Sequence, residues 1–152
     1  DQKSLNIGYI NLREIDLIKS FTFEIKLPSN YQNLSNTTMV TAKLMNENLA
    51  KRTITVNSSE FKIINAPSSS KFNILTNSLT FDIIGPEEDI MNITDRDVVV
   101  EIDLMDEKIQ SDSFSMDASI IIPNYKKVWS LGKHSVALEV DKNAVVPANV
   151  LP

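Results

Sequence analysis

The side chains in this sequence that could perform chemistry are mainly carboxylates, and they gather in two short stretches. The first holds Glu87, Glu88, Asp89, Asp95 and Asp97, and the second holds Asp103, Asp106 and Glu107. A suitably spaced carboxylate pair can hydrolyse a glycosidic bond, so a glycoside hydrolase is one hypothesis. The simpler interpretation is structural, because the helix dipole favours acids in a first helical turn. The pair at 95 and 97 lacks the central glycine and closing glutamate of a calcium loop, so we predict no metal site.

Nucleophiles and general bases are scarce in the rest of the chain. His134 is the single histidine and there is no cysteine, which excludes disulfides, thiolate nucleophiles and zinc-thiolate sites. Neither a Gly-x-Ser-x-Gly turn nor a phosphate-binding glycine loop occurs, since the three glycines are far apart. A lone histidine without a partner group favours a structural role. We therefore predict that the protein is not an enzyme and has neither catalytic residues nor a cofactor.

Three aromatic residues are the candidates for an interaction site. Tyr31, Tyr125 and Trp129 follow prolines in two segments predicted to be loops. Aromatic side chains in loops can bind sugars or anchor a protein interface, although they can equally cap the end of a sheet. A contact surface for a partner protein and a glycan-binding surface both stay open at this point.

Composition limits the class of protein and of partner. The 152 residues carry a net charge of −5 and are 42% apolar, which is typical of a folded globular protein. An acidic surface argues against nucleic acid and against a polybasic membrane patch. The sequence shows neither an apolar run of membrane-spanning length nor a signal peptide, as expected of a piece of a longer anchored protein.

The element that must position most of the carboxylates is the block of residues 79–104. Apolar and polar residues alternate from 79 to 83, which predicts a strand, and residues 98–104 alternate in the same way. Between them, Gly85-Pro86 is predicted to stop the strand, the glycine through an unusual backbone angle and the proline as a first helical residue. A short helix near 86–93 should follow, with its acids in the first turn.

The remaining chain predicts further strands and therefore an all-β fold. These strands are expected at residues 5–12, 21–27, 39–45, 53–56, 61–65, 72–75, 114–122 and 136–140. Residues 46–51 and 125–133 are predicted to be connections, and residues 142–152 a tail or linker.

An internal repeat relates the first strands to the last ones. The strand of residues 21–27 ends at Pro28 and matches residues 114–122, which end at Pro123. Val40-x-Ala42-x-Leu44 likewise matches Val136-x-Leu138-x-Val140. We therefore predict a partial unit at 1–46, a complete unit at 47–141 and a tail at 142–152. An unpaired half-unit should favour intermolecular pairing through an exposed strand edge, whether it folds separately or joins a larger sheet.

These elements resemble the YbbR domain. The similarity rests on the strand ending in Gly85-Pro86, the following Glu-Glu-Asp-Ile, and the strand that closes on Ile102-Asp103-Leu104. YbbR domains are tandem extracytoplasmic modules of bacterial membrane-anchored proteins, so the resemblance implies a YbbR-like all-β module at the cell surface. It also implies a non-enzymatic regulator of a membrane diadenylate cyclase, which makes cyclic di-AMP, with an anchor helix outside this chain. A cell-wall or glycan-binding β-module is the alternative.

Overall fold

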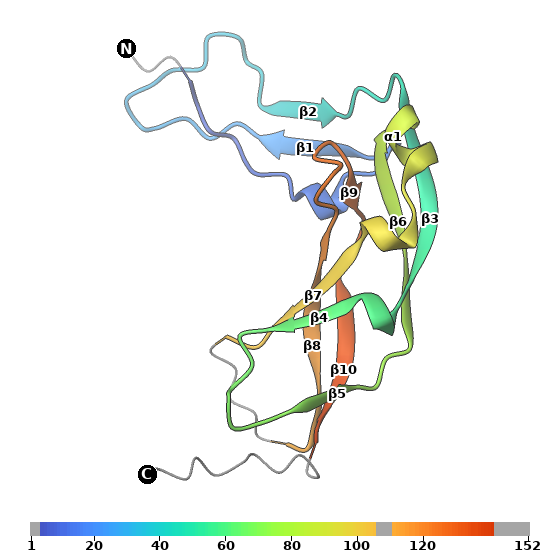
Figure 1. The fold of residues 1–152 in the computed structure, drawn as a ribbon. Helices are drawn as coiled ribbons and strands as arrows, with labels where there is room; N and C mark the ends of the chain where they lie inside the picture. The colour runs from blue at the N-terminus through green and yellow to red at the C-terminus, as the bar shows by residue number, and fades with distance from the viewer. Residues whose placement is uncertain (1–3, 106–110, 142–152) are drawn as a thin grey trace.

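The computed structural model describes residues 4–105 and 111–141, and Figure 1 shows them as strands with a few helical turns. The strands are β1 (Ser20–Glu24), β2 (Met39–Lys43), β3 (Leu49–Asn57), β4 (Phe61–Ile64), β5 (Phe72–Ile74), β6 (Ser78–Pro86), β7 (Val99–Asp103), β8 (Ser113–Ile121), β9 (Trp129–Ser130) and β10 (His134–Val140). The helical segments are η1 (Leu12–Glu14), η2 (Ser58–Glu60), α1 (Glu87–Asn92) and η3 (Asp95–Asp97). The predicted all-β fold with a short helix near 86–93 is confirmed.

The described strands form three sheets. One has the order β4-β7-β8-β10-β5, in which only β4 and β7 are parallel, and a second has the antiparallel order β3-β6-β9. β1 and β2 form a separate antiparallel hairpin, drawn in blue and cyan at one end of the molecule in Figure 1. Among the described residues, this hairpin is thus a sheet of its own and is not hydrogen-bonded into either larger sheet.

The hydrophobic core lies between the three-stranded and the five-stranded sheets. Every fully buried apolar side chain of the described residues falls between Ile54 and Leu138 in the sequence. Ile83, Ile102 and Leu138 are completely enclosed and belong to three different strands. The alternating pattern predicted these inward faces, because side chains on a strand point to opposite sides in turn. Residues 4–48 contribute no fully buried side chain.

The Gly85-Pro86 corner differs from the prediction in its backbone. β6 continues through Pro86, and Pro86 is the N-cap of α1 instead of its first helical residue. Gly85 is not among the described residues with positive φ, so an unusual backbone angle is not the reason for glycine. The reason is space: a Cβ on Gly85 would lie 2.6 Å from Val128 Cγ2 and 3.2 Å from the Lys127 carbonyl oxygen. The glycine lets the 125–128 loop approach the backbone of β6.

The strand predicted at residues 5–12 was wrong. That stretch has no strand pairing, and it ends in the 3-10 turn η1. Gly8 lies against the ring of Phe23, where an added Cβ would be 2.3 Å from a ring carbon. The segment therefore crosses the apolar face of the hairpin instead of joining its edge. The predicted connections were also too long, since β3 already begins at Leu49 and β9 lies within 125–133.

Candidate functional site

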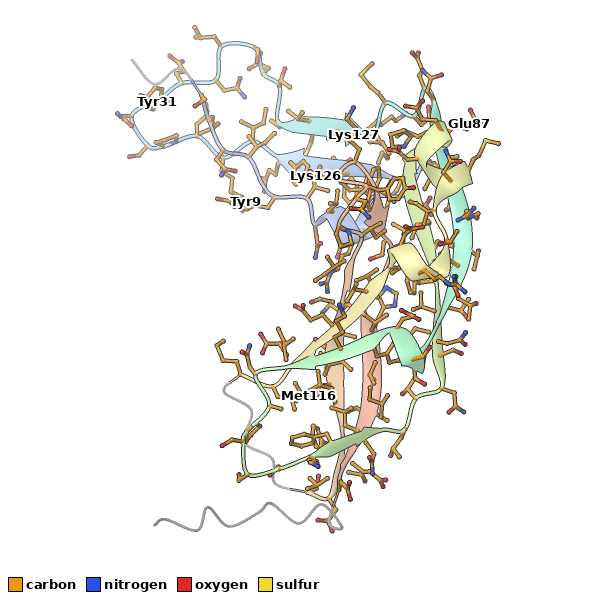
Figure 2. All side chains as sticks on the ribbon, viewed as in Figure 1. Tyr9, Tyr31, Glu87, Met116, Lys126 and Lys127 are labelled. Atoms are coloured by element: carbon orange, nitrogen blue, oxygen red, sulfur yellow. The ribbon has the colours of Figure 1, made fainter. Side chains whose placement is uncertain are left out.

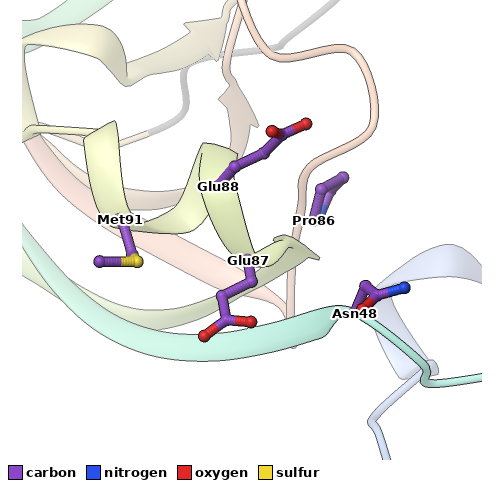
Figure 3. Close-up of a pocket in the computed structure, with 5 residues that line it drawn as sticks. All are labelled: Asn48, Pro86, Glu87, Glu88 and Met91. Atoms are coloured by element: carbon purple, nitrogen blue, oxygen red, sulfur yellow. The ribbon is translucent and has the colours of Figure 1, made fainter.

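Two residues of the first acidic stretch, Glu87 and Glu88, line an open pocket at the start of α1. Asn48, Pro86, Glu87, Glu88 and Met91 line a volume of about 520 Å³, which Figure 3 shows. The Glu87 backbone N–H donates to the Asn48 carbonyl oxygen at 2.9 Å, which fixes the helix start to the loop before β3. The side chains of Glu87 and Glu88 point away from each other in Figure 3. Diverging carboxylates are poorly placed to act together on one glycosidic bond.

Two of the other candidate carboxylates, Asp97 and Asp103, have structural partners. Asp97 Oδ2 accepts hydrogen bonds of 2.8 Å from the backbone N–H and the hydroxyl of Thr94, and these bonds lower the Asp97 pKa. The Asp103 carboxylate accepts from Asn65 Nδ2 at 2.7 Å and from the Met105 N–H, which likewise lower its pKa. A glycosidase acid needs a raised pKa, so these shifts go the wrong way for that chemistry. Asp106 and Glu107 lie outside the described residues.

Metal ligands do not gather in the part of the chain that the structure describes. No group of three or more histidine or carboxylate side chains there is placed to hold a metal ion. None of the helices in the same residues is long and apolar enough to cross a membrane.

His134 lies partly buried at the start of β10 beside Phe81. The two ring centroids are 4.9 Å apart, and no described residue is a hydrogen-bond partner of the buried His134 Nε2. Burial lowers the pKa of His134 below its usual 6.5, against an opposing hydrogen bond with the Leu131 backbone, and the positive charge of Arg13 lowers it further. A histidine that stays neutral without a partner for Nε2 is a packing group here.

We expect acid to destabilise the protein through this histidine. Because its folded pKa is below the unfolded value, the unfolded chain binds the proton more tightly. The free energy of unfolding should keep the full contribution of neutral His134 above the unfolded pKa, and it should fall as the pH drops toward the folded pKa. Urea unfolding between pH 7.5 and pH 5 measures this slope, and His134→Phe should flatten it. An equal slope in the variant would contradict the assignment.

The described aspartates with lowered pKa values lose their contributions only below about pH 4.

The three aromatic candidates do not form one surface. Tyr31 is 49% exposed at the outer end of the hairpin. The other two candidates flank Lys126 and Lys127 in the sequence, and Figure 2 places these two lysines beside β9, away from Tyr31. Tyr125 is half-buried and packs against the core. Trp129 is half-buried in β9, and its indole N–H donates to the Ile15 carbonyl oxygen at 3.0 Å. Their role in an interaction stays a prediction, and only Tyr31 is openly exposed.

Trp129 is one of the contacts that attach the hairpin half to the core. The Gly132 N–H donates to the Arg13 carbonyl oxygen at 2.9 Å, and Lys51 Nζ lies 3.0 Å from Asp16 Oδ2. The hydrogen bond to Lys51 is also the main reason that the pKa of Asp16 is lowered. The turn around residues 13–17 therefore connects residues 4–48 to the three-stranded sheet and to the loop before β10.

Removing the indole hydrogen bond should weaken this attachment. We expect Trp129→Phe to lower the free energy of unfolding by about 1 kcal/mol, since the Ile15 carbonyl loses its partner while most of the ring packing remains. Urea unfolding measures the loss. Tyr31→Phe, which alters an exposed ring, is the control and should change the free energy by less than about 0.5 kcal/mol. Equal stability of the two variants would show that the indole bond does not hold the turn.

The sequence reasoning missed a second pocket, on the hairpin. Ile10, Ile15, Phe21, Ala42, Lys43 and Leu44 line a small apolar volume of about 130 Å³. Its signal was present in the repeat, because Ala42 stands where the second copy has the larger Leu138. Within the described residues this pocket adjoins a strand, β2, whose outer edge has no backbone partner.

The comparisons with known proteins are sparse. No family model matches the chain, and no curated protein matches it. Among solved structures, the chain matches the YbbR-like domain of the lmo2119 protein from Listeria monocytogenes. The identity is 13% and the TM-score is 0.47, over 60% of this chain and 93% of the other. The chain is similar to that YbbR-like domain.

Proposed function

We propose that this chain is a non-enzymatic YbbR-like module that acts by protein contact outside the bacterial cytoplasm. The observation that carries the proposal is the hairpin of β1 and β2. It forms a two-stranded sheet apart from the core, and both of its outer edges lack a backbone partner among the described residues. A free sheet edge is a ready site for pairing with another polypeptide.

The distribution of exposed apolar side chains supports a contact role for the same half of the molecule. The most exposed large apolar side chains of the described residues are Ile18, Tyr9, Leu34 and Met45, each more than four-fifths exposed. All of them lie in residues 4–48. Exposed apolar side chains are a feature of protein interaction surfaces, although none of these alone defines one.

We further propose that the partner is a membrane diadenylate cyclase, with this module as part of its membrane-anchored regulator. This step rests on the sequence resemblance around Gly85-Pro86 and residues 102–104. The acidic composition fits a protein partner better than nucleic acid. The wall- or glycan-binding alternative gains no support from Trp129 and Tyr125, because the first donates inward to Ile15 and the second packs on the core.

Crosslinking in membranes with the full-length anchored protein tests this proposal. We expect mass spectrometry of the captured material to recover a diadenylate cyclase. An anchored protein of similar size with a different extracytoplasmic domain is the control, and it should not recover the enzyme. Capture of wall polymers, or of unrelated surface proteins without the cyclase, would overturn the cyclase as partner.

A further inference from the structure

His134 begins β10 close to the place where the hairpin half (residues 4–48) meets the core. Two residues before it, the Gly132 N–H donates to the Arg13 carbonyl oxygen at 2.9 Å, and we call this hydrogen bond the junction bond. Figure 1 shows η1, the segment that contains Arg13, beside β9. Any movement of the turn between β9 and β10 therefore acts on the attachment of the hairpin half.

The turn between β9 and β10 also forms one wall of the histidine site. Gly132 has a φ of +84°, a conformation that favours glycine, and an added Cβ there would lie 3.9 Å from His134 Cε1. The Leu131 backbone has a hydrogen bond with the His134 side chain, and the Leu131 N–H donates to the Asp82 carbonyl oxygen at 2.9 Å. The same short turn thus contacts the ring, the core strand β6 and the hairpin half.

The site suits a neutral histidine and disfavours a protonated one. The ring packs on Phe81 with 4.9 Å between the centroids, and the buried His134 Nε2 has no hydrogen-bond partner. Protonation makes both ring nitrogens donors, so a charged N–H would stand at Nε2 without an acceptor. A buried charge without a partner is strongly unfavourable, and a protonated ring must therefore reach water.

The charged side chains around the ring do not offset a positive charge on it. Arg13 acts on His134 from η1, and its own positive charge opposes protonation. Three charged neighbours are exposed, namely Glu14 on η1, Asp117 on β8 and Lys133 in the turn. Asp82 follows the inward-facing Phe81 on β6, so its carboxylate lies on the other face of the sheet, where it accepts from the Thr53 hydroxyl at 2.6 Å.

We propose that acid loosens the hairpin half from the core, with His134 as the group that takes up the proton. The protonated ring moves toward water and displaces the turn that lies against it, which breaks the junction bond between Gly132 and Arg13. The positive charges of the ring and of Arg13 then separate. This device goes beyond the proposed contact role, because it makes the attachment of the hairpin half depend on pH.

The direction of this pH dependence follows from the closed and open forms of the junction. In the closed form burial lowers the pKa of His134 below its usual 6.5, whereas a ring in water returns toward that value. The open form therefore binds the proton more tightly. The junction should be fully closed above the open-form pKa and should open as the pH falls toward the closed-form pKa.

The neighbouring ion pair should survive this opening. Lys51 Nζ lies 3.0 Å from Asp16 Oδ2, and the hydrogen bond to Lys51 is the main reason that the pKa of Asp16 lies below 3.8. The Asp16 carboxylate therefore stays charged while His134 titrates. The hairpin half is loosened at Gly132 but remains attached through Lys51, so the response differs from detachment.

Residue-resolved NMR hydrogen exchange of the full chain tests the opening directly. Between pH 7.5 and pH 5, after correction for intrinsic exchange, we expect protection of the Gly132 amide to fall at least about threefold, since uptake of one proton allows up to about tenfold per pH unit. The Leu104 amide donates to the Ile64 carbonyl oxygen in the core at 3.0 Å and should stay protected. Constant protection of Gly132 would overturn the proposal, as would an equal loss at Leu104, which would indicate global unfolding.

Variants identify the group that takes up the proton. His134→Phe keeps an aromatic ring beside Phe81 but cannot be protonated, so protection of Gly132 should no longer depend on pH. Arg13→Gln removes the opposing charge but keeps the carbonyl of the junction bond, and it should make the acid-dependent loss about twofold smaller. Arg96→Gln changes an exposed arginine on η3 and should leave the loss unchanged. A pH dependence that persists in His134→Phe would overturn the proposal.

The arginine variants keep the proposal testable if His134→Phe does not fold. Arg13→Gln leaves the histidine ring and its packing in place, so it changes only the charge that opposes protonation. Equal acid-dependent losses in Arg13→Gln and Arg96→Gln would contradict a positive charge forming beside η1. These measurements involve no partner protein, so failure of the acid response and failure of the proposed cyclase partner are distinguishable.

Discussion

Replacing Ile102 by alanine is expected to lower the free energy of unfolding by about 3 kcal/mol. Ile102 lies in the middle of β7, fully enclosed, opposite Ile63 on the parallel neighbour β4. The smaller side chain removes apolar contacts and leaves a cavity, because a core between two sheets relaxes only in part. Chemical denaturation with urea measures the loss.

Two further variants show whether the loss follows burial. Ile102→Val removes a single methylene and should lower the free energy of unfolding by about 1 kcal/mol. Ser119→Ala, at an exposed position of the neighbouring β8, should change it by less than about 0.5 kcal/mol. If the alanine at 102 were no more harmful than the alanine at 119, the placement of β7 in the core would be wrong.

Gly85→Ala is expected to lower the free energy of unfolding by about 2 kcal/mol, as overpacking of a close contact does. The added Cβ would meet Val128 Cγ2 at 2.6 Å and the Val128 Cα at 3.1 Å. Backbone on the 125–128 loop cannot rotate away as a side-chain end can, so the loop and β6 must separate. Thermal unfolding followed by circular dichroism measures the effect.

A second substitution tests whether steric contact is the cause. Val128→Ala removes the nearest methyl groups, so the double variant should lose less stability than the sum of the two single losses. The Lys127 carbonyl oxygen at 3.2 Å would still be crowded, which leaves the rescue incomplete. If the stability losses of the two single variants simply added in the double variant, backbone conformation and not steric contact with Val128 would be the reason for glycine at position 85.

Much of the fold follows from alternation in the sequence. β6, β8 and β10 were predicted because apolar residues recur at every second position and enter the core, as Phe81 and Ile83 do in β6. The same rule failed for residues 5–12, where Leu5, Ile7 and Tyr9 also alternate. That segment packs Gly8 across the ring of Phe23 and forms no ladder, so a tertiary contact outweighs the local pattern.

The candidate site was less predictable, because its parts come from distant positions. The polar end of Trp129 meets the Ile15 carbonyl oxygen across 114 residues of sequence, and no local signal shows this. The repeat did indicate an open half-unit. The sequence could not show that the N–H groups of Thr41 and Lys43 point away from β1, because this depends on the register of the hairpin. It could not show the pocket beside Ala42 either, because the pocket depends on how the hairpin packs in three dimensions.

The central claim is that β2 repeats the pairing of β10 but has no strand on its outer edge among the described residues, and residue-resolved amide hydrogen exchange of the full chain tests it most directly. We predict that Thr41 and Lys43 exchange at least about tenfold faster than Val40 and Ala42, whose N–H groups face β1. On β10, the Ala137 N–H, equivalent to that of Thr41, donates to the Thr76 hydroxyl, and Glu139, equivalent to Lys43, pairs with Asn73 of β5, so both amides should be protected like their neighbours. Equal protection of all four β2 amides would mean that the edge is already paired, and would contradict the account.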